Sequence, residues 1–384
     1  MSNTTIIVHY SEIGLKGRNR NIFENKLIKN IKAHINQLGS FKLVHLHDRI
    51  LIEISQLSPL ISQALQKTFG IANFAIAKTT KLDLNEIKEQ VLNLAKTKEF
   101  TTFAIQASRS NKKFPLTSQQ INEQVGGVIL DNLKNKKVKL KNPNLTIYVD
   151  ILKDQALIYS EKIKTFGGLP TGTAGNVISL ISGGIDSPVA SFQIMKRGCQ
   201  IIFCHFHSYP QTSIESQDQV KKLVSILDQY QQNSKLYLIP ILDIQKQIVA
   251  KCSAKLRVVL YRRMMMRIAT KIAELENAKA LITGDSIGQV ASQTLENIQA
   301  ISNATDLPIF RPLAGLDKEE IITYAKKIET YETSIQPFGD CCSLFIPDSP
   351  ETKAKLDEVL KNERELEIDK LINDSFQQLV IKQF

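Results

Sequence analysis

Hydrophobic residues near the start of the chain change from strand-like to helical spacing and back. We expect a strand at residues 5–10, a helix at 22–38, and a hairpin from 41–47 and 49–54. A β-α-β-β order of this kind is typical of part of a ferredoxin-like sandwich. We assign it to an N-terminal domain over residues 1–56.

A second group of alternating elements follows and forms a predicted domain over residues 57–164. The expected helices are 60–69, 84–96 and 118–132, and the expected strands are 73–78, 102–106, one near Val138, and 145–152.

Four glycines and a proline then fall within residues 165–175, so we assign a linker to residues 165–176. It is either a plain flexible connection or a segment that leans over a ligand, because it leads straight into the next strand.

Strands and helices alternate through the last region, residues 177–384. The expected strands are 177–181, 200–206, 235–239 and 279–283, and the expected helices are 188–197, 215–230, 254–276, 318–328 and 351–373. This alternation predicts an α/β domain with a parallel, doubly wound sheet. Ligands of such sheets bind at the carboxyl ends of the strands. Ser182, His205 and Gly284 each follow a predicted strand, so we expect them to converge there.

Charge is divided unevenly between these regions. Residues 1–175 hold 25 Lys and Arg against 13 Asp and Glu, whereas the whole chain has a formal net charge of +11. The excess of positive charge therefore lies in the N-terminal part. A solvated surface explains scattered lysines but not their segregation, which indicates that this part binds a polyanion.

Composition excludes several classes of protein. No apolar run is long enough for a transmembrane helix, and the N-terminus lacks the pattern of a signal peptide. The five cysteines include no CxxC pair, so we expect free thiols in a reducing cytoplasm and no structural metal site.

The stretch Ser-Gly-Gly-Ile-Asp-Ser-Pro, residues 182–188, joins a predicted buried strand to a predicted helix. Its glycines allow close approach of a ligand, and a helix N-terminus attracts anions, so phosphate is the expected ligand. Ser187 is the predicted N-cap and Pro188 the first helical residue. The GK[ST] of a Walker loop is absent, so we expect no lysine to reach the terminal phosphates.

This loop resembles that of the PP-loop ATP pyrophosphatases, which cleave ATP between the α and β phosphates. Further stretches make the chain similar to the tRNA 4-thiouridine synthetases (tRNA uracil 4-sulfurtransferases). These stretches are YSEIGLKGRN (10–19), GGLP (167–170), HFHS (205–208), RRMMMR (262–267), TGDSIGQVASQ (283–293) and DCC (340–342). The resemblance implies a ferredoxin-like domain, an RNA-binding THUMP domain and a PP-loop domain.

The resemblance also implies an ATP site with Mg²⁺. Asp186 is the implied contact to magnesium or to a hydrogen-bond network. The implied nucleotide contacts are Leu180, Ile181, Ser182, Gly183, Gly184, Ser187, His205, Phe206, Arg262, Gly284 and Gln293. Phe206 offers an aromatic face to adenine, and Arg262 can neutralise phosphate charge. Met264, Met265 and Met266 are expected to pack in the core.

Adjacent cysteines in a loop-like stretch, Cys341 and Cys342, suggest reactive rather than buried thiols. In the family a cysteine here accepts persulfide sulfur from a cysteine desulfurase, and it aligns with Cys342. Its sulfur would attack an adenylated uracil at position 8 of tRNA. Longer members carry a rhodanese domain whose cysteine relays the persulfide; we expect none here, and Cys341, Cys204 and Cys252 remain alternatives for the thiol that resolves the persulfide.

The candidate tRNA contacts are Lys16, Arg18, Arg20, Arg109, Lys112, Lys113 and the lysines of residues 134–141, although the last group could be a solvated loop. The family further suggests a homodimer and, in some lineages, a role in thiamine synthesis. The competing hypotheses are another PP-loop enzyme, such as a tRNA 2-thiolase or an amidotransferase-type synthetase, and a non-catalytic RNA-binding protein. The basic N-terminal part argues against the former, and the intact loop, Arg262 and Cys342 argue against the latter.

Overall fold

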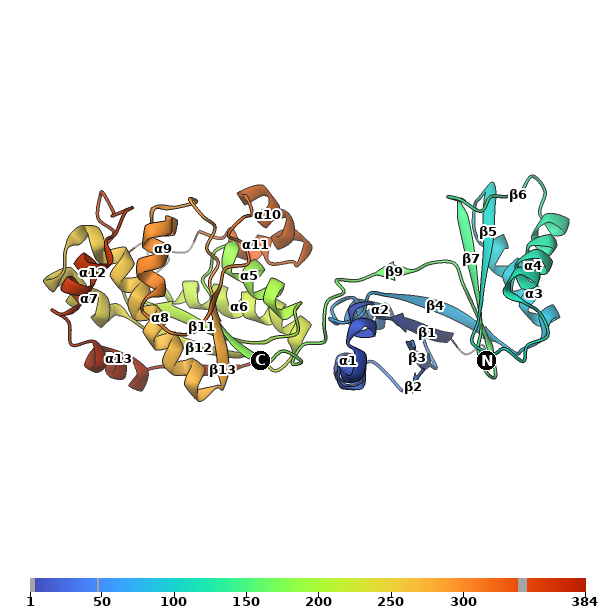
Figure 1. Ribbon diagram of the computed structural model, residues 1–384, viewed down its shortest axis with the longest axis horizontal. Coiled ribbons are helices and arrows are strands. Elements are labelled where there is room, and N and C mark those ends of the chain that lie inside the picture. The colour runs from blue at the N-terminus through green and yellow to red at the C-terminus, as the bar shows by residue number, and fades with distance from the viewer. Residues whose placement is uncertain (1–3, 47, 338–343) are drawn as a thin grey trace. The chain divides into compact units, whose positions relative to one another are not determined.

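The computed structural model describes residues 4–46, 48–337 and 344–384. The chain divides into two compact units, Met1–Leu169 and Pro170–Phe384 (Figure 1). Each has hydrophobic cores of its own.

Unit 1 is built on a nine-stranded sheet of the order β2-β3-β1-β4-β8-β7-β5-β6, with β9 paired to β4. Its strands are β1 (Thr4–His9), β2 (Phe41–His45), β3 (Arg49–Ile54), β4 (Asn73–Thr80), β5 (Thr102–Arg109), β6 (Lys137–Val138), β7 (Leu145–Ile151), β8 (Ala156–Tyr159) and β9 (Ile163–Lys164). Its α-helices are α1 (Arg20–Ile35), α2 (Pro59–Gln66), α3 (Leu84–Lys96) and α4 (Ser118–Asn132), and short 3-10 turns occupy Glu12–Leu15 and Gly17–Asn19.

The alternation in β1 places its side chains on two faces of this sheet. Ile6 and Val8 pack in the core with α1 and α2, whereas Ile7 lies in a smaller cluster on the opposite face. β1 pairs antiparallel with both β3 and β4. The first core and the sheet therefore continue past residue 56 into residues 57–80.

The glycine-rich segment is hydrogen-bonded at both of its ends. Gly70 donates its N–H to the carbonyl of Gly167, and Gly172 and Ala174 donate theirs to the carbonyl of Gly198. Its first residues therefore belong to unit 1 and its last to unit 2.

Unit 2 contains a six-stranded sheet of the order β14-β13-β10-β11-β12-β15. The strands are β10 (Asn176–Leu180), β11 (Gln200–His207), β12 (Lys235–Pro240), β13 (Ala278–Ile282), β14 (Ile309–Phe310) and β15 (Val380–Gln383). All neighbours pair in parallel except β15, which runs antiparallel to β12.

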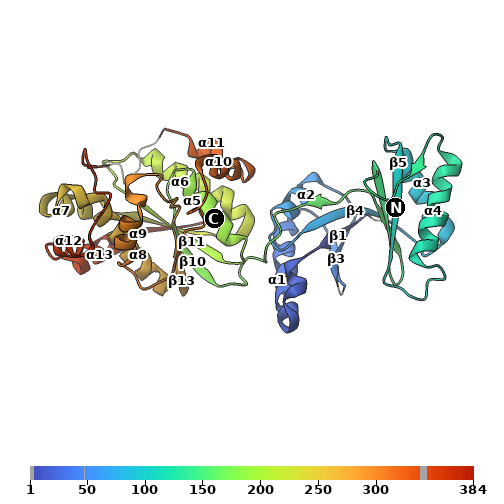
Figure 2. The ribbon, with the colours of Figure 1, turned by 45° about the horizontal axis from the view of Figure 1, so that its top comes forward.

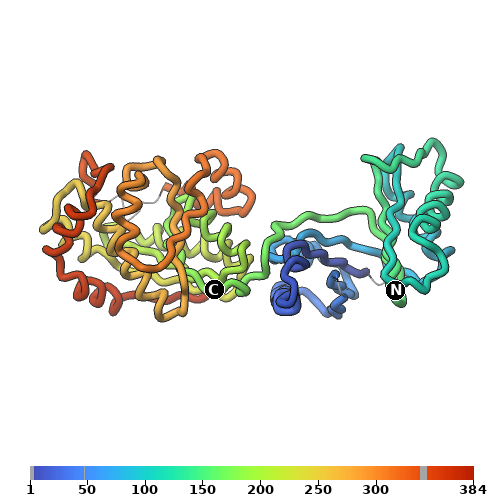
Figure 3. The backbone as a smooth tube through the Cα atoms, in the orientation of Figure 1, coloured from blue at the N-terminus to red at the C-terminus, as the bar shows by residue number. Residues whose placement is uncertain are grey.

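Helices cover both faces of this sheet, as the two ribbon views show (Figures 1 and 2). The α-helices are α5 (Asp186–Met195), α6 (Ile214–Gln231), α7 (Leu242–Lys251), α8 (Arg257–Leu275), α9 (Leu295–Ser302), α10 (Lys318–Lys327), α11 (Tyr331–Ser334), α12 (Leu356–Glu363) and α13 (Ile368–Gln377). Short 3-10 turns occupy Ala254–Leu256 and Ala291–Gln293. The tube view follows the same path of the chain (Figure 3). No helix in the described parts of the chain has the length and apolar character of a membrane span.

Three local expectations for unit 2 were wrong. The helix after the glycine loop begins at Asp186, so Ser187 is not its N-cap and Pro188 is its third residue. His205 lies inside β11 and not after the strand. The helix expected at 351–373 is two helices, and the break at residues 364–367 lets Leu366 and Ile372 both reach the core beneath α8.

Candidate active site

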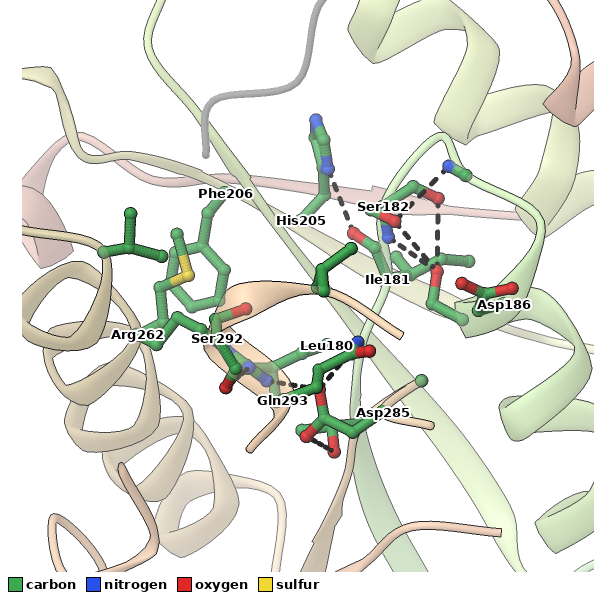
Figure 4. Close-up of a pocket in the computed structure, with 17 residues that line it drawn as sticks. Leu180, Ile181, Ser182, Asp186, His205, Phe206, Arg262, Asp285, Ser292 and Gln293 are labelled. Atoms are coloured by element: carbon green, nitrogen blue, oxygen red, sulfur yellow. Dashed lines mark hydrogen bonds and ion pairs between the residues drawn. The ribbon is translucent and has the colours of Figure 1, made fainter. Parts of the chain in front are cut away.

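A pocket of about 270 Å³ opens at the carboxyl ends of β10, β11 and β13, where the parallel sheet was expected to bind its ligand. Figure 4 shows Phe206 and Arg262 on one side of it and Ser182 and Asp186 on the other. The residues that line it are Leu180, Ile181, Ser182, Gly184, Asp186, Ser187, His205, Phe206, Val258, Arg262, Met265, Thr283, Gly284, Asp285, Val290, Ser292 and Gln293.

The glycine loop is closed on itself by its two serines. Ser182 donates its N–H to Ser187 Oγ at 2.9 Å, and Gly184 donates its N–H to Ser182 Oγ at 3.3 Å. Gly284 lies against the start of α5, since a Cβ at this position would be 2.8 Å from the backbone nitrogen of Ser187. Only glycine allows this contact between the end of β13 and the loop.

Asp186 stands at the first turn of α5 and already has two partners. Lys318, from α10, donates to its Oδ1 at 2.6 Å, and Gln289 donates to its Oδ2 at 2.9 Å. The missing Walker lysine thus does not leave the loop without a nearby lysine, because Lys318 arrives from 132 residues further along the chain.

The opposite side of the pocket is apolar and aromatic. Phe206 is buried near the end of β11, and Leu180, Val258 and Met265 are further apolar residues of the lining. His205 Nδ1 is 3.1 Å from the carbonyl oxygen of Ile181. If that bond is donated by the ring, the neutral imidazole carries its lone pair on Nε2.

A buried carboxylate, Asp285, accepts hydrogen bonds from cationic side chains beside the pocket. Arg262 donates to its Oδ1 at 2.6 Å, and Arg311 and Thr283 donate to its Oδ2 at 3.2 and 2.7 Å. Burial would raise the pKa of Asp285, but Arg262 and the Thr283 hydroxyl stabilise the carboxylate and lower its pKa below the ordinary value. Two guanidinium groups are thus fixed by one anion.

Most of the residues that the sequence suggested for nucleotide binding meet at this pocket. Gly183 is the exception and faces Gln219 instead. Sequence reasoning missed Val258, Met265, Thr283, Asp285, Val290 and Ser292 as lining residues. Thr283 and Asp285 belong to the TGDS stretch, whose polar residues directly after a buried strand were an available signal. The described residues that line the pocket all come from position 180 onwards.

The cysteines separate into two groups. Cys341 and Cys342 lie outside the described residues. Cys199 and Cys204 are buried and Cys252 is half-buried, and burial raises the pKa of all three thiols. Because the thiolate is the reactive form, these surroundings argue against Cys204 and Cys252 as resolving thiols.

Two of the three arginines that were expected to bind RNA in unit 1, Arg20 and Arg109, are engaged within the protein. Arg20 donates to Glu24 at 2.7 Å and to Tyr10 at 3.0 Å, and Arg109 donates to the carbonyl groups of Phe114 and Leu116.

Most of the candidate lysines of unit 1 are more exposed to solvent than these two arginines. Lys16 is half-buried beside the Phe23 ring. Arg18, Lys112, Lys113, Lys134, Lys137, Lys139 and Lys141 are exposed. The exposed positive charge of unit 1 is therefore mostly lysine.

Comparison with known proteins identifies the family. Residues 172–368 match the family model described as thiamine biosynthesis protein (ThiI), residues 81–161 match a THUMP domain, and residues 5–75 match the ThiI ferredoxin-like domain. A probable tRNA sulfurtransferase of Thermoanaerobacter pseudethanolicus is 44% identical over 98% of this chain and 99% of its own. The chain belongs to the tRNA sulfurtransferase family. The resemblance and the three-part fold expected from the sequence are confirmed.

Further members of the tRNA sulfurtransferase family are similar over comparable lengths. A probable tRNA sulfurtransferase of Alkaliphilus oremlandii is 42% identical over 98% of this chain and 97% of its own. Among solved structures, the crystal structure of a 4-thiouridine synthetase–RNA complex with bound ATP is 36% identical, with a TM-score of 0.92 and complete coverage of both chains.

Proposed function

We propose that this protein transfers sulfur to uridine 8 of tRNA in an ATP-dependent reaction that yields 4-thiouridine. The single observation that carries the proposal is the pocket at the carboxyl ends of three parallel strands. It brings together the Ser-Gly-Gly loop, the aromatic ring of Phe206 and Arg262, which is bonded to Asp285. The similarity to a 4-thiouridine synthetase with bound ATP and RNA supports the choice of ligands.

The two sides of the pocket suit the two ends of ATP. Phe206 offers a flat apolar face to adenine, and the carbonyl groups of Leu180 and Ile181 can accept from the edge of the base, since the Ile181 N–H is already donated to Cys204. The N–H groups of the loop and of the first turn of α5 suit the phosphates. A pocket of about 270 Å³ is small for a whole ATP, so the β and γ phosphates would extend over the exposed Gly184.

A magnesium ion fits this arrangement with one protein ligand. Mg²⁺ at nucleotide sites is commonly held by one or two carboxylates together with the phosphates. Asp186 is the carboxylate at the loop that is open enough to serve, since Asp285 is enclosed by its own partners. When bound, the ion would neutralise the leaving pyrophosphate, while Lys318 and Arg262 supply fixed positive charge beside it.

The proposed first step is adenylation. O4 of the uracil attacks the α phosphorus of ATP, the bond to the β phosphate breaks, and pyrophosphate leaves as the N3 proton passes to solvent. Arg262 stabilises the charge that develops on the α phosphate. O4 then carries AMP, which makes C4 open to attack.

The proposed second step uses a persulfide on Cys342, supplied by a cysteine desulfurase. Its terminal sulfur attacks C4 and AMP leaves, so that the uracil is joined to the enzyme by a C4–S–S–Cys bond. A second thiol then attacks the sulfur of Cys342, which frees 4-thiouridine and leaves a disulfide that a dithiol reductant reopens. The burial of Cys204 and Cys252 favours Cys341 or a thiol from outside the chain as the resolving group.

Unit 1 is the proposed tRNA-binding part of the protein. Its exposed lysines suit the phosphate backbone, which is bound mainly by charge. A homodimer, in which one subunit presents tRNA to the other, is part of the same proposal. A second role as sulfur donor for the thiazole of thiamine would use the same persulfide, and a thiamine requirement in a strain carrying Cys342→Ala would support it.

The test is mass spectrometry of unmodified tRNA after incubation with the protein, ATP, Mg²⁺, cysteine and a cysteine desulfurase. We expect a mass gain at uridine 8 that corresponds to replacement of oxygen by sulfur. The variant Cys342→Ala should form no 4-thiouridine but should still attach AMP from labelled ATP to tRNA. Binding of tRNA without either product would instead support a non-catalytic RNA-binding protein.

A further inference from the structure

One buried side chain connects the glycine loop to the segment that precedes the paired cysteines. Gln219, on α6, is only 4% exposed. Its Nε2 donates to the carbonyl oxygen of Thr333 at 2.8 Å and to that of Gln336 at 3.4 Å. Its Oε1 occupies the space beside Gly183, where a Cβ would lie 2.4 Å from it. A side chain at position 183 would therefore displace the end of Gln219.

A second contact joins the same two segments directly. Ser334, the last residue of α11, donates its hydroxyl to the carbonyl oxygen of Gly184 at 3.3 Å and is 8% exposed. The ribbon views agree in placing α5, α6, α10 and α11 together on one side of unit 2 (Figures 1 and 2). Gly184 is therefore hydrogen-bonded to Ser334, and Gly183 packs beside the side chain that holds the carbonyl groups of Thr333 and Gln336.

We propose that Gln219 and Ser334 are positioning residues that set the start of the Cys342 segment relative to the nucleotide. This inference rests on the proposed function, because it assigns the sulfur step to Cys342. Gln336 precedes Cys342 by six residues. Two hydrogen bonds from Gln219 to the main chain at the end of α11 therefore hold the start of that stretch beside the loop that would bind the phosphates.

The physical reason lies in the carbonyl groups at the end of α11. The last carbonyls of a helix have no partner within the helix, and buried polar groups without partners are costly. Gln219 supplies one amide to two of them. Loss of that amide should let residues 333–336 move away from the loop without opening the adenine side of the pocket, which is built from β10, β11 and α8.

The test compares adenylation with thiolation in single variants. Gln219→Met keeps the length of the side chain and removes its amide, and Ser334→Ala removes the hydroxyl. For both variants we expect transfer of label from α-labelled ATP to tRNA with a KM for ATP within about threefold of the wild type. We expect 4-thiouridine formation to fall roughly 10- to 100-fold, as misplacement of a reacting group does. Ser334→Thr keeps the hydroxyl and should restore thiolation.

A matched control is available on the same helix. Gln231, at the end of α6, is 9% exposed and donates its Nε2 to the carbonyl oxygen of Ile201 at 2.8 Å, away from α11. Gln231→Met removes this bond together with those to the Ile201 N–H and to Ser234, so it should lower stability but leave the ratio of thiolation to adenylation unchanged.

The possible outcomes separate this inference from the proposed function. Equal losses of both reactions in Gln219→Met and Ser334→Ala, or unchanged thiolation, would overturn the positioning role while wild-type activity still supported the proposed function. Thiolation that survives in Cys342→Ala would instead overturn the sulfur step on which the inference depends.

Discussion

Each unit buries a carboxylate that is bonded to cationic side chains, but the two carboxylates lie in different surroundings. Glu24 in unit 1 and Asp285 in unit 2 have side chains that are 4% and 5% exposed. Glu24 accepts hydrogen bonds from Tyr10 and Arg20, and His45 Nε2 lies 3.3 Å from it. These partners lie within 21 positions of Glu24, on or beside α1 and the first strands.

Asp285 draws its partners from greater distances along the chain, and one of them faces a pocket. Arg262 comes from α8 and Arg311 follows β14, and only Arg262 of the two lines the pocket. A buried carboxylate bonded to cationic side chains thus lies within the core in unit 1 and beside a pocket in unit 2. An arginine in the basic unit is therefore weaker evidence of RNA contact than an exposed lysine.

The largest effect should come from removing the charge at Asp285. Asp285→Asn keeps the shape of the side chain but leaves Arg262 and Arg311 without their shared anion. We expect adenylation to fall roughly 100-fold, the size of effect seen when a charge-stabilising group is lost from an active site. Steady-state kinetics with varied ATP would measure it. A kcat and KM equal to those of the wild type would show that Asp285 is not needed to position Arg262.

The matching change in unit 1 should affect stability alone. Glu24→Gln weakens the bonds to Arg20 and Tyr10, so we expect the free energy of unfolding to fall by about 2 kcal/mol, a typical value for hydrogen bonds to a charged group. Adenylation by the folded variant should be unchanged. Glu53→Gln, which breaks an exposed pair with Lys42, is the control and should cost less than about 1 kcal/mol. A loss of adenylation activity in Glu24→Gln would contradict the difference proposed between the two buried carboxylates.

Exposed lysines should contribute to RNA affinity more than the engaged Arg109 does. Lys137→Ala together with Lys139→Ala should weaken tRNA binding and lower the slope of log K against log salt by about 1–2. Titration of tRNA at several salt concentrations gives that slope, with exposed Lys279 of unit 2 mutated as the control. If only Arg109→Ala changed the slope, the division between lysines and engaged arginines would be wrong.

The smallest effect is a dependence of stability on pH at His207. Burial, with the neighbouring His205 and Lys221, lowers the pKa of His207 to about 4 from its ordinary 6.5. Between these values the unfolded chain binds a proton that the folded chain does not, so stability falls as the pH drops through this window. His207→Asn should lose less stability between pH 7 and 5 than the wild type does, as urea unfolding would measure. His34→Asn, in unit 1, is the control.

The central part of the candidate site was predictable from the sequence because its residues are continuous with strands. Ser182 follows a buried apolar run, and Gly284 follows another, so the parallel sheet alone brings them together. Gly183 lies beside the end of Gln219, which occupies the space that a Cβ would take. No periodicity marks a glutamine on a helix as the partner of a glycine 36 residues earlier.

Contacts between distant segments account for what the sequence did not reveal. Lys318 meets Asp186 only because α10 packs beside α5, and Arg311 meets Asp285 through a two-residue strand that pattern alone does not detect. The break between α12 and α13 contains neither glycine nor proline, so the charged pattern resembled one long helix. Each of these features depends on tertiary packing rather than on local preference.

The most direct test of the account is which bond of ATP is broken in the presence of tRNA and Mg²⁺ without a sulfur donor. Parallel reactions with α-labelled and γ-labelled ATP separate the two possibilities. The account predicts that the α label appears on tRNA and that the γ label appears in pyrophosphate. Release of the γ label as inorganic phosphate, with the α label in ADP, would contradict it.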